Sequence, residues 1–194
     1  MISLFMSNWL SRSAHVGFGR GARVLVCTIV LAAAAGLGAA APAVDRAKPQ
    51  PWPPPLGPKS EWIDEIRVDK SERLMEMWRD GRMLRRYRIA LGDAPVGHKF
   101  MQGDERTPEG RYRIEYRNGR SRFHLSLRVS YPDADDRARA KASGVDPGGD
   151  IMIHGGTPAG YHRDWTDGCI AVSNAEIEEI WRLVPVGTPI IIVP

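Results

Sequence analysis

Two glycine turns interrupt a run of alternating apolar and polar residues, and this pattern constrains the fold more than any other feature. Between Ile63 and Val129, apolar side chains recur at about every second position, which is the period of a strand with one buried face. Asp80-Gly81 and Asn118-Gly119 favour the tight turns of β-hairpins. A helix over residues 71–86 is the main alternative, but Asp80-Gly81 would break it. We therefore expect a mainly β fold, a mixed β-sandwich with one or two short helices.

Turn-rich segments separate the expected strands. The longest runs from Gly92 to Gly110 and ends in Thr107-Pro108-Glu109-Gly110, which forces a turn before the next strand. His98 lies in this loop and is expected in solvent. His124 falls on the polar side of a strand, where it would form part of a sheet face or the wall of a groove. The strands are expected at Ile63–Asp69, Arg73–Trp78, Met83–Leu91, Arg111–Tyr116, Phe123–Val129, Ile151–His154 and Ile190–Val193.

Two helices are expected in the second half of the chain. A short polar helix between Pro132 and Gly144 has Asp133 as its cap. A second helix begins at Ser173 or Asn174, because Glu176 follows Ser173 at the spacing of a capping box. Its apolar residues recur at helical spacing and should pack on the sheet. These residues are Ile177, Ile180, Trp181 and Val184, and Pro185 and Gly187 follow them as stop signals.

Residues 1–43 have the layout of a secretory signal peptide. Three arginines precede an apolar run that begins at Val24, and Ala41-Pro42-Ala43 supplies small residues for cleavage after Ala43. Met6 is an alternative start. An uncleaved membrane anchor and a lipoprotein made through Cys27 are less favoured alternatives, because the run is rich in Ala and Gly and bulky Val26 precedes the cysteine. We expect export to the periplasm, with residues 44–60 as a proline-rich linker and residues 61–194 as the folded domain.

Export changes the charge and the thiol count of the mature chain. Removing three arginines from the 27 basic residues leaves 24, against 23 acidic residues. The formal charge becomes +1, so the sequence no longer favours nucleic-acid binding. Of the two cysteines only Cys169 remains. A lone cysteine in an exported protein cannot form an internal disulfide and is either a buried inert thiol or a reactive one.

The segment from Ile151 to Asn174 carries the residues best suited to chemistry. His154 follows a short apolar strand, and Cys169 stands fifteen positions later, directly after Gly168. A thiol beside an imidazole is the arrangement of a nucleophile and its general base. The backbone N–H groups of Gly168 and Cys169 are candidates for holding an oxyanion. Gly155, directly after the histidine, leaves room for a substrate backbone.

Other interpretations of the same residues remain open. Cys169 can be a small buried core residue, and His154 a structural histidine with satisfied hydrogen bonds. A metal site is the further alternative, since ligand types gather at His154, His162, Asp164, Asp167 and Cys169. Their spacing fits no compact zinc pattern, and one thiolate with scattered oxygens is a poor structural set. We expect no metal.

The residues resemble the L,D-transpeptidase catalytic domain family of the bacterial cell wall (YkuD-type). The signature is His154-Gly155 followed by Thr166-Asp167-Gly168-Cys169-Ile170, with histidine before cysteine. This order differs from that of papain-like and NlpC/P60-like thiol hydrolases. The resemblance extends over residues 61–194. Further segments that carry it are Val68–Glu72, Gly92–Lys99 and Gly103–Tyr112.

The resemblance implies a reaction without a metal or organic cofactor. Cys169 would attack the third-residue carbonyl of a peptidoglycan stem tetrapeptide, with His154 as general base and acid. D-alanine would leave, and an amine acceptor would take the acyl group, giving a 3→3 cross-link or a tethered protein. A hydrolytic relative, an L,D-carboxypeptidase or amidase, is the first alternative. A wall-binding module with an inert cysteine is the second.

Two positions depart from the common pattern of the family. Asp167 stands where many members have histidine, and Ala171 where many have arginine or asparagine. Asp167 would orient His154 or His162, and Arg163 would supply the missing cation. Thr166 is the remaining candidate for orienting groups or binding substrate. These departures bear on which acceptor receives the acyl group.

Overall fold

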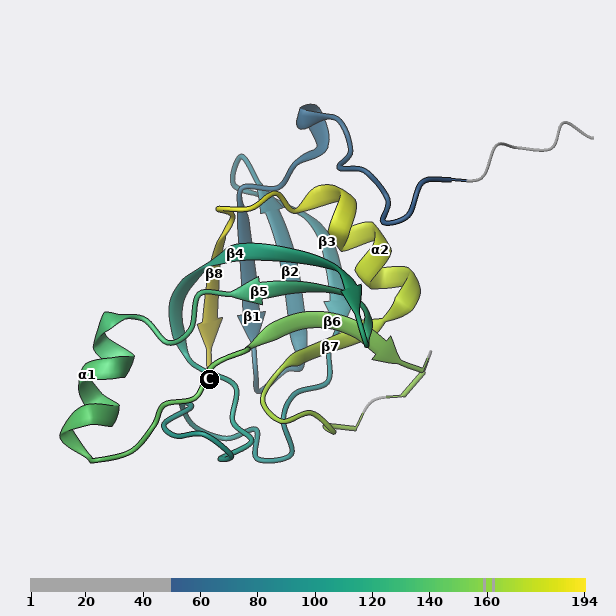
Figure 1. Cartoon of the computed structure of the whole chain (residues 1–194). Coiled ribbons are helices and arrows are strands. Elements are labelled where there is room, and N and C mark those ends of the chain that lie inside the picture. Colours follow the sequence, from purple (N-terminus) through teal and green to yellow (C-terminus); the bar gives the residue numbers. More distant parts are fainter. Residues whose placement is uncertain (1–49, 159, 162) are drawn as a thin grey trace, which may run out of the picture. The chain divides into compact units, whose positions relative to one another are not determined.

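An eight-stranded mixed sheet forms the frame of the described part of the chain (Figure 1). The structure is a computed structural model that describes residues 50–158, 160–161 and 163–194. The strand order is β3-β2-β1-β8-β4-β5-β6-β7. The predicted signal peptide and the first residues of the predicted linker lie outside the described residues. The strands are β1 Glu65–Asp69, β2 Leu74–Arg79, β3 Arg82–Arg88, β4 Gly110–Ser121, β5 His124–Val129, β6 Met152–Thr157, β7 Ile170–Ser173 and β8 Pro189–Val193.

The long, curved β4 joins the two halves of the sheet (Figure 1). Its first residues pair antiparallel with β8, and its later residues pair antiparallel with β5. The β1–β8 and β6–β7 pairs are parallel, and the remaining pairs are antiparallel. At the outer edges, Ala90 exchanges two backbone hydrogen bonds with Ala171, of 2.8 and 2.9 Å. The sheet therefore folds over a shared apolar core, and the loop after β3 reaches β7.

Both predicted helices are confirmed, with their predicted caps. The 3-10 turn η1 spans Lys59–Glu61, α1 spans Ala134–Ala142, and α2 spans Asn174–Leu183. Asp133 and Ser173 each cap their helix through a capping box, which satisfies backbone N–H groups that a helix start leaves free. The apolar face of α2 packs against β5, β6 and β7. Within the described residues, no helix has the length and apolar character needed to cross a membrane.

One predicted hairpin turn is confirmed and the other is wrong. Asp80 and Gly81 both have positive φ, at 50° and 71°, as a tight turn between β2 and β3 requires. Asn118-Gly119 instead lies inside β4, and the chain turns after Ser121. The reason is a tertiary contact: a Cβ on Gly119 would lie 2.6 Å from Pro53 Cγ, so the glycine makes room for a proline. The mainly β fold with mixed strands is confirmed.

The described part of the predicted linker packs on the domain. Trp181 Nε1 in α2 donates to Pro54 O at 2.7 Å, and the Gly57 N–H donates to Arg182 O at 2.9 Å. Pro54 is buried, and the Trp52 ring lies 4.7 Å from the His124 ring. The folded part of the chain therefore extends upstream of Glu61. A proline-rich segment is easily held in this way, since its restricted backbone loses little entropy on docking.

Candidate active site

The turn from Thr166 to Cys169 delivers the cysteine to the start of β7. Thr166 Oγ1 donates to Cys169 O at 2.8 Å and accepts from the Gly168 N–H at 3.2 Å. Thr107 Oγ1 donates to Gly168 O at 2.9 Å. Gly168 has a φ of 114°, and a Cβ there would lie 2.5 Å from Arg106 O. Only glycine fits this backbone, and buried hydroxyl groups hold it from both sides.

The parallel pairing of β6 and β7 places His154 beside this turn. Ile153 pairs with Ile170 and His154 pairs with Ala171. Cys169 directly precedes β7 and lies two residues before Ala171; since side chains alternate along a strand, His154 and Cys169 extend from the same face of the sheet. The hydrogen bond of Cys169 Sγ goes to Asp150 O at 3.5 Å rather than to the imidazole. The structure thus brings the predicted pair onto one face of the sheet, with the thiol turned toward Asp150.

His154 is held in one orientation and one tautomer. The side chain is 2% exposed, and Nδ1 donates to Gly155 O at 2.6 Å. Phe123 stacks on the ring at 4.5 Å, and Trp165 meets its edge at 5.6 Å. Because Nδ1 carries the proton, Nε2 of the neutral ring keeps a lone pair. Burial lowers the pKa of His154, although the Gly155 carbonyl partly opposes that shift. The imidazole is therefore neutral near neutral pH and can accept a proton at Nε2.

The surroundings of Cys169 favour the protonated thiol. Burial raises its pKa most, and the carboxylates of Asp167 and Asp150 add to this. The Met152 backbone N–H and the Lys99 ammonium oppose the shift. With the pKa of the imidazole lowered and that of the thiol raised, the resting pair is neutral rather than an ion pair. Such a pair suits a reaction in which the base takes the proton as sulfur attacks.

The other predicted residues differ in position. Asp167 is exposed and acts on the thiol through its charge. Arg163 is exposed, and His162 lies outside the described residues. Asp164, a metal-ligand type in the sequence, instead pairs with Arg73 at 2.7 Å and accepts the Leu91 N–H at 2.8 Å. It therefore anchors the loop between the histidine and the cysteine.

Gly155 and Gly168 have uses that their sequence positions do not reveal. A Cβ on Gly155 would lie 2.7 Å from Asn174 Oδ1 and 2.9 Å from Ile177 Cγ2, so this glycine admits the start of α2. The Gly168 N–H, predicted to face an oxyanion, donates to Thr166 Oγ1. To hold an oxyanion it would have to leave that partner. The Cys169 N–H is the better placed of the two candidates in this respect.

Lys70 and Thr107 support the site and were not predicted for it. Lys70 is 2% exposed, and its Nζ donates to Thr107 O at 3.0 Å, to Gly97 O at 2.6 Å and to Glu109 Oε1 at 2.7 Å. Burial lowers the pKa of Lys70, while Glu109 opposes the shift. Three acceptors satisfy the buried ammonium. Lys70 thereby holds the Thr107 backbone in place, and the Thr107 hydroxyl in turn holds the Gly168 carbonyl. The Thr107–Gly110 segment was the signal available in the sequence.

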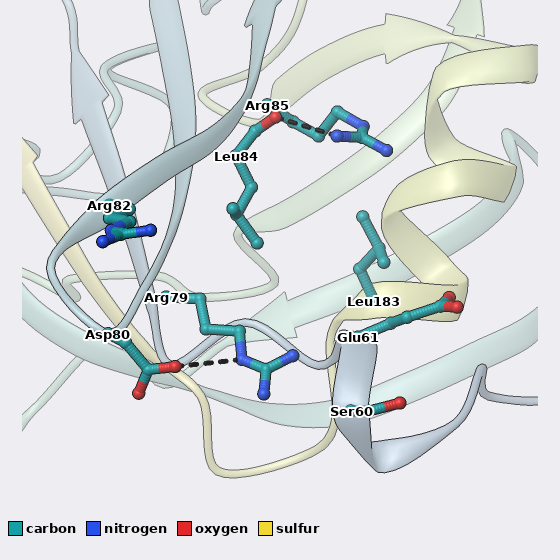
Figure 2. Close-up of a pocket in the computed structure, with 8 residues that line it drawn as sticks. All are labelled: Ser60, Glu61, Arg79, Asp80, Arg82, Leu84, Arg85 and Leu183. Atoms are coloured by element: carbon teal, nitrogen blue, oxygen red, sulfur yellow. Dashed lines mark hydrogen bonds and ion pairs between the residues drawn. The ribbon is translucent and has the colours of Figure 1, made fainter.

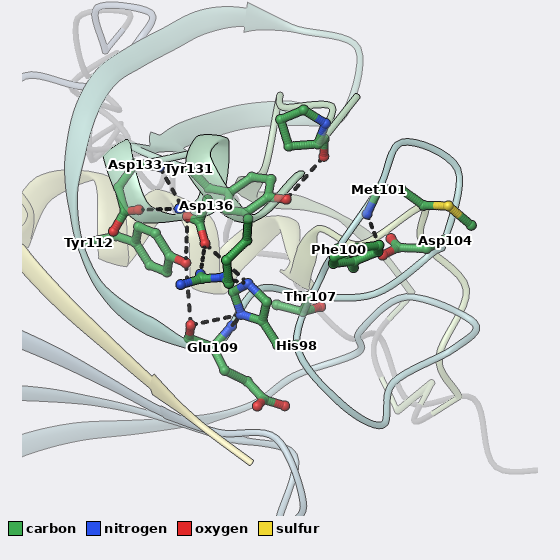
Figure 3. A network of polar contacts seen from close by, with 12 residues as sticks. His98, Phe100, Met101, Asp104, Thr107, Glu109, Tyr112, Tyr131, Asp133 and Asp136 are labelled. Carbon is green, nitrogen blue, oxygen red and sulfur yellow. Dashed lines mark hydrogen bonds and ion pairs between the residues drawn. The ribbon is translucent and has the colours of Figure 1, made fainter. Parts of the chain in front are cut away.

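The expectation that His98 lies in solvent is wrong. The ring is half-buried between the loop before β4 and helix α1, as Figure 3 shows. Its Nδ1 accepts from the Glu109 N–H at 3.0 Å, and its Nε2 lies 3.1 Å from Asp136 Oδ1. Tyr112 donates to the same buried carboxylate at 3.0 Å. These contacts tie α1 to the loop that carries Thr107.

Replacing Thr107 with valine is expected to slow the reaction without unfolding the protein. Valine keeps the shape but leaves the buried Gly168 carbonyl without its hydroxyl donor, at a cost of about 1–3 kcal/mol. We expect kcat to fall about tenfold or more, because a small displacement of the nucleophile is costly. Steady-state kinetics and urea unfolding measure the two effects.

Thr188→Val is the matched control. Thr188 is also buried, and its hydroxyl donates to Pro185 O at 2.8 Å. It should lose similar stability and keep its kcat. Equal loss of kcat in both variants would contradict a positioning role for Thr107.

A cavity of about 580 Å³ lies away from His154 and Cys169. Figure 2 shows it between the β2–β3 hairpin and the segment around η1. The described catalytic candidates do not line it. Its lining residues are Ser60, Glu61, Arg79, Asp80, Arg82, Leu84, Arg85 and Leu183.

Comparison with known proteins identifies the family. YafK of Escherichia coli (strain K12), provisionally named an L,D-transpeptidase, is 29% identical over 125 residues, which are 61% of this chain and 46% of YafK. The chain thus spans about half the length of the curated relatives it matches. Two solved structures share the fold: the helical cell shape determining protein Pgp2 of Campylobacter jejuni and Bd1075 of Bdellovibrio bacteriovorus.

For Pgp2 the TM-score is 0.52 at 23% identity, covering 67% of this chain and 47% of Pgp2. For Bd1075 it is 0.52 at 22% identity, covering 72% and 50%. Residues 63–192 match the family described as the L,D-transpeptidase catalytic domain, YkuD. Since that match spans most of the chain and contains His154, Cys169 and their supporting loop, the protein belongs to the L,D-transpeptidase catalytic domain family.

Proposed function

We propose that the protein is a cysteine-dependent L,D-transpeptidase that acts on peptidoglycan stem tetrapeptides. The register of β6 and β7 carries the proposal: His154 pairs with Ala171, two residues after Cys169, so the two side chains extend from the same face, and the bond from Nδ1 to Gly155 O leaves Nε2 with the lone pair that accepts a proton. The neutral state of both groups supports general-base activation of the thiol. Family membership supports a transpeptidase-type enzyme.

The first half-reaction forms an acyl-enzyme. Rotation of the Cys169 side chain turns Sγ away from Asp150 O and toward the substrate. Sγ attacks the carbonyl carbon of the third residue while His154 Nε2 takes the thiol proton. The Cys169 N–H stabilises the oxyanion. The intermediate then collapses, the C–N bond to D-alanine breaks, and the imidazolium returns its proton to the leaving amine. A thioester and free D-alanine result.

The second half-reaction transfers the acyl group to an amine. The acceptor nitrogen attacks the thioester, His154 Nε2 accepts its excess proton, and the C–S bond breaks. The departing thiolate regains a proton from the imidazolium. A stem-peptide amine gives a 3→3 cross-link, and a protein amine gives a wall-tethered protein. Water in place of the amine gives the L,D-carboxypeptidase reaction.

Mass spectrometry of purified protein incubated with disaccharide-tetrapeptide tests this proposal. A dimer that lacks one D-alanine is expected for the transpeptidase. Free disaccharide-tripeptide alone would assign the hydrolytic alternative instead. An unchanged substrate, with no acyl adduct on Cys169, would contradict both and favour a wall-binding module.

The proposed site of action is the cell envelope, after export through the signal features of residues 1–43. The family's action on peptidoglycan supports this placement. Fractionation of cells that express the full chain tests it, together with N-terminal sequencing of the mature protein. Cleavage after Ala43 and recovery from the periplasm are expected.

The pH dependence of alkylation should reveal the neutral pair. Because the pKa of Cys169 is raised, iodoacetamide should label it slowly near pH 7, and the rate should rise only above the ordinary thiol pKa. Because the pKa of His154 is lowered, turnover should persist below the pH at which an ordinary histidine protonates, and fall on further acidification. Labelling and turnover are measured from pH 5 to pH 10. Full thiolate reactivity at pH 6 would contradict a neutral resting pair.

A further inference from the structure

A groove of about 730 Å³ lies on the far side of Phe123 from the His154 ring. We call it the hairpin groove, because the tip of the β4–β5 hairpin forms most of its lining. Figure 1 places this hairpin next to the end of β6 and the start of α2. The lining residues are Trp52, Gly119, Arg120, Ser121, Arg122, Phe123, His124, Gly156 and Asn174.

The hairpin groove shares a wall with His154. Phe123 lines the groove and also stacks on the imidazole at 4.5 Å. Gly156 lines it two residues after His154 on β6, whereas the register of β6 and β7 sets Cys169 beside Met152, so that four residues, roughly 13 Å of strand, separate the groove from the thiol. About four residues of an extended peptide cover that distance. A stem peptide whose third-residue carbonyl lies at Cys169 can therefore reach this groove with the side that leads to the disaccharide.

The groove is cationic. Arg120 and Arg122 are exposed, and neither forms an ion pair with any residue that the structure describes. No acidic side chain is among the lining residues. The nearby Glu178 is already bound to His124 Nε2 at 2.7 Å. Guanidinium groups in this situation retain their donors for an anionic ligand.

An aromatic wall completes the groove. Trp52 is 54% exposed, although its ring packs against His124 at 4.7 Å. The hydrogen bond between its Nε2 and Glu178 Oε1 holds that histidine, and Pro53 fills the space next to Gly119. The docked linker thus contributes a fixed apolar surface to a groove that two arginines also line. Such a groove suits a peptide that carries aliphatic side chains and charged carboxylates.

We propose that the hairpin groove binds the carboxylate-bearing part of the stem peptide, with Arg120 and Arg122 as the carboxylate ligands. This inference rests on the proposed function, and it assigns the residues that recognise the negative charge of the substrate. The arginines contact the peptide on the side of the attacked carbonyl that leads to the disaccharide, and they act on affinity rather than on chemistry at Cys169.

Kinetics of Arg120→Gln, Arg122→Gln and the double variant test this assignment. With disaccharide-tetrapeptide as substrate, KM should rise about tenfold for each arginine, as expected for the loss of a charge-assisted hydrogen bond. Because the catalytic pair is untouched, kcat should stay within about twofold of wild type. Higher salt should reduce the difference, since exposed charges are screened. Arg113→Gln is the matched control, an exposed arginine of β4 outside the groove, and its KM should not change.

Binding without turnover separates this proposal from the proposed function. In the Cys169→Ala background, calorimetric titration with disaccharide-tetrapeptide should show binding that the double arginine variant loses. A tetrapeptide with amidated carboxylates should bind both proteins equally weakly. Loss of this difference, or an equal loss in Arg113→Gln, would overturn the groove assignment even where wild-type turnover is normal. Binding that depends on the arginines, with no turnover in wild type, would instead overturn only the proposed function. Absence of binding to Cys169→Ala overturns the groove.

Discussion

Replacement of Cys169 with serine is expected to lower the release of D-alanine from disaccharide-tetrapeptide by about 10⁴-fold or more. A serine hydroxyl is a far weaker nucleophile, and the imidazole of His154 alone cannot compensate for it. The two side chains are close in size, so the buried turn that Thr166 and Thr107 hold should keep its structure. Detection of D-alanine by a coupled assay measures the loss, and thermal unfolding checks the fold.

His154→Gln provides the companion variant. Its loss should be about 10²–10⁴-fold, because general-base assistance disappears while the thiol remains. The double variant should be no worse than Cys169→Ser, since the two groups act as one unit. Additive losses would mean that the two residues act independently, and full activity of Cys169→Ser would rule out a thiol nucleophile.

Gly168→Ala is expected to lower the free energy of unfolding by about 2–4 kcal/mol. The added methyl group would lie 2.5 Å from Arg106 O, against backbone rather than against a movable side chain, and the φ of 114° is unfavourable for alanine. Urea unfolding at neutral pH measures this change. Activity should fall further than stability alone requires, because relief of the clash moves the Cys169 backbone.

Gly187→Ala isolates the contribution of the backbone angle. Gly187 has a φ of 94°, and a Cβ there would meet no atom within 4 Å. It should cost only about 1 kcal/mol. The difference between the two variants in the free energy of unfolding is the steric cost at the turn from Thr166 to Cys169. Equal losses would mean that the close approach of Arg106 to Gly168 does not constrain the site.

Local patterns predicted much of the secondary structure. The alternation in Ile63–Val129 and the Asp80-Gly81 pair predicted β1, β2, β3 and their hairpin, because strand period and turn geometry are properties of neighbouring residues. The capping residues Asp133 and Ser173 predicted both helix starts for the same reason. The hairpin turn predicted at Asn118-Gly119 was wrong, since the glycine there makes room for Pro53, which lies far upstream in the sequence.

The supporting side chains of the site were beyond local patterns. His98 lies in a glycine-rich loop, yet its ring is half-buried against Asp136 of α1. Lys70 lies in a tight turn, yet its ammonium donates to three acceptors from a distant loop, on Gly97, Thr107 and Glu109. Contacts of this kind depend on which loops the sheet brings together. Nothing within a few residues of either side chain indicates them.

By itself the sequence determined which reactive groups this protein carries: a thiol at Cys169, an imidazole at His154, the order of the two, and the signature that they share with a family. Only the tertiary structure decided how these groups are placed and whether they are protonated. The parallel register of β6 and β7 sets the two side chains on one face of the sheet. Burial lowers the pKa of His154 and raises that of Cys169, so that both groups are neutral at rest. Register and burial arise from packing among distant segments, so the residue types alone do not contain them.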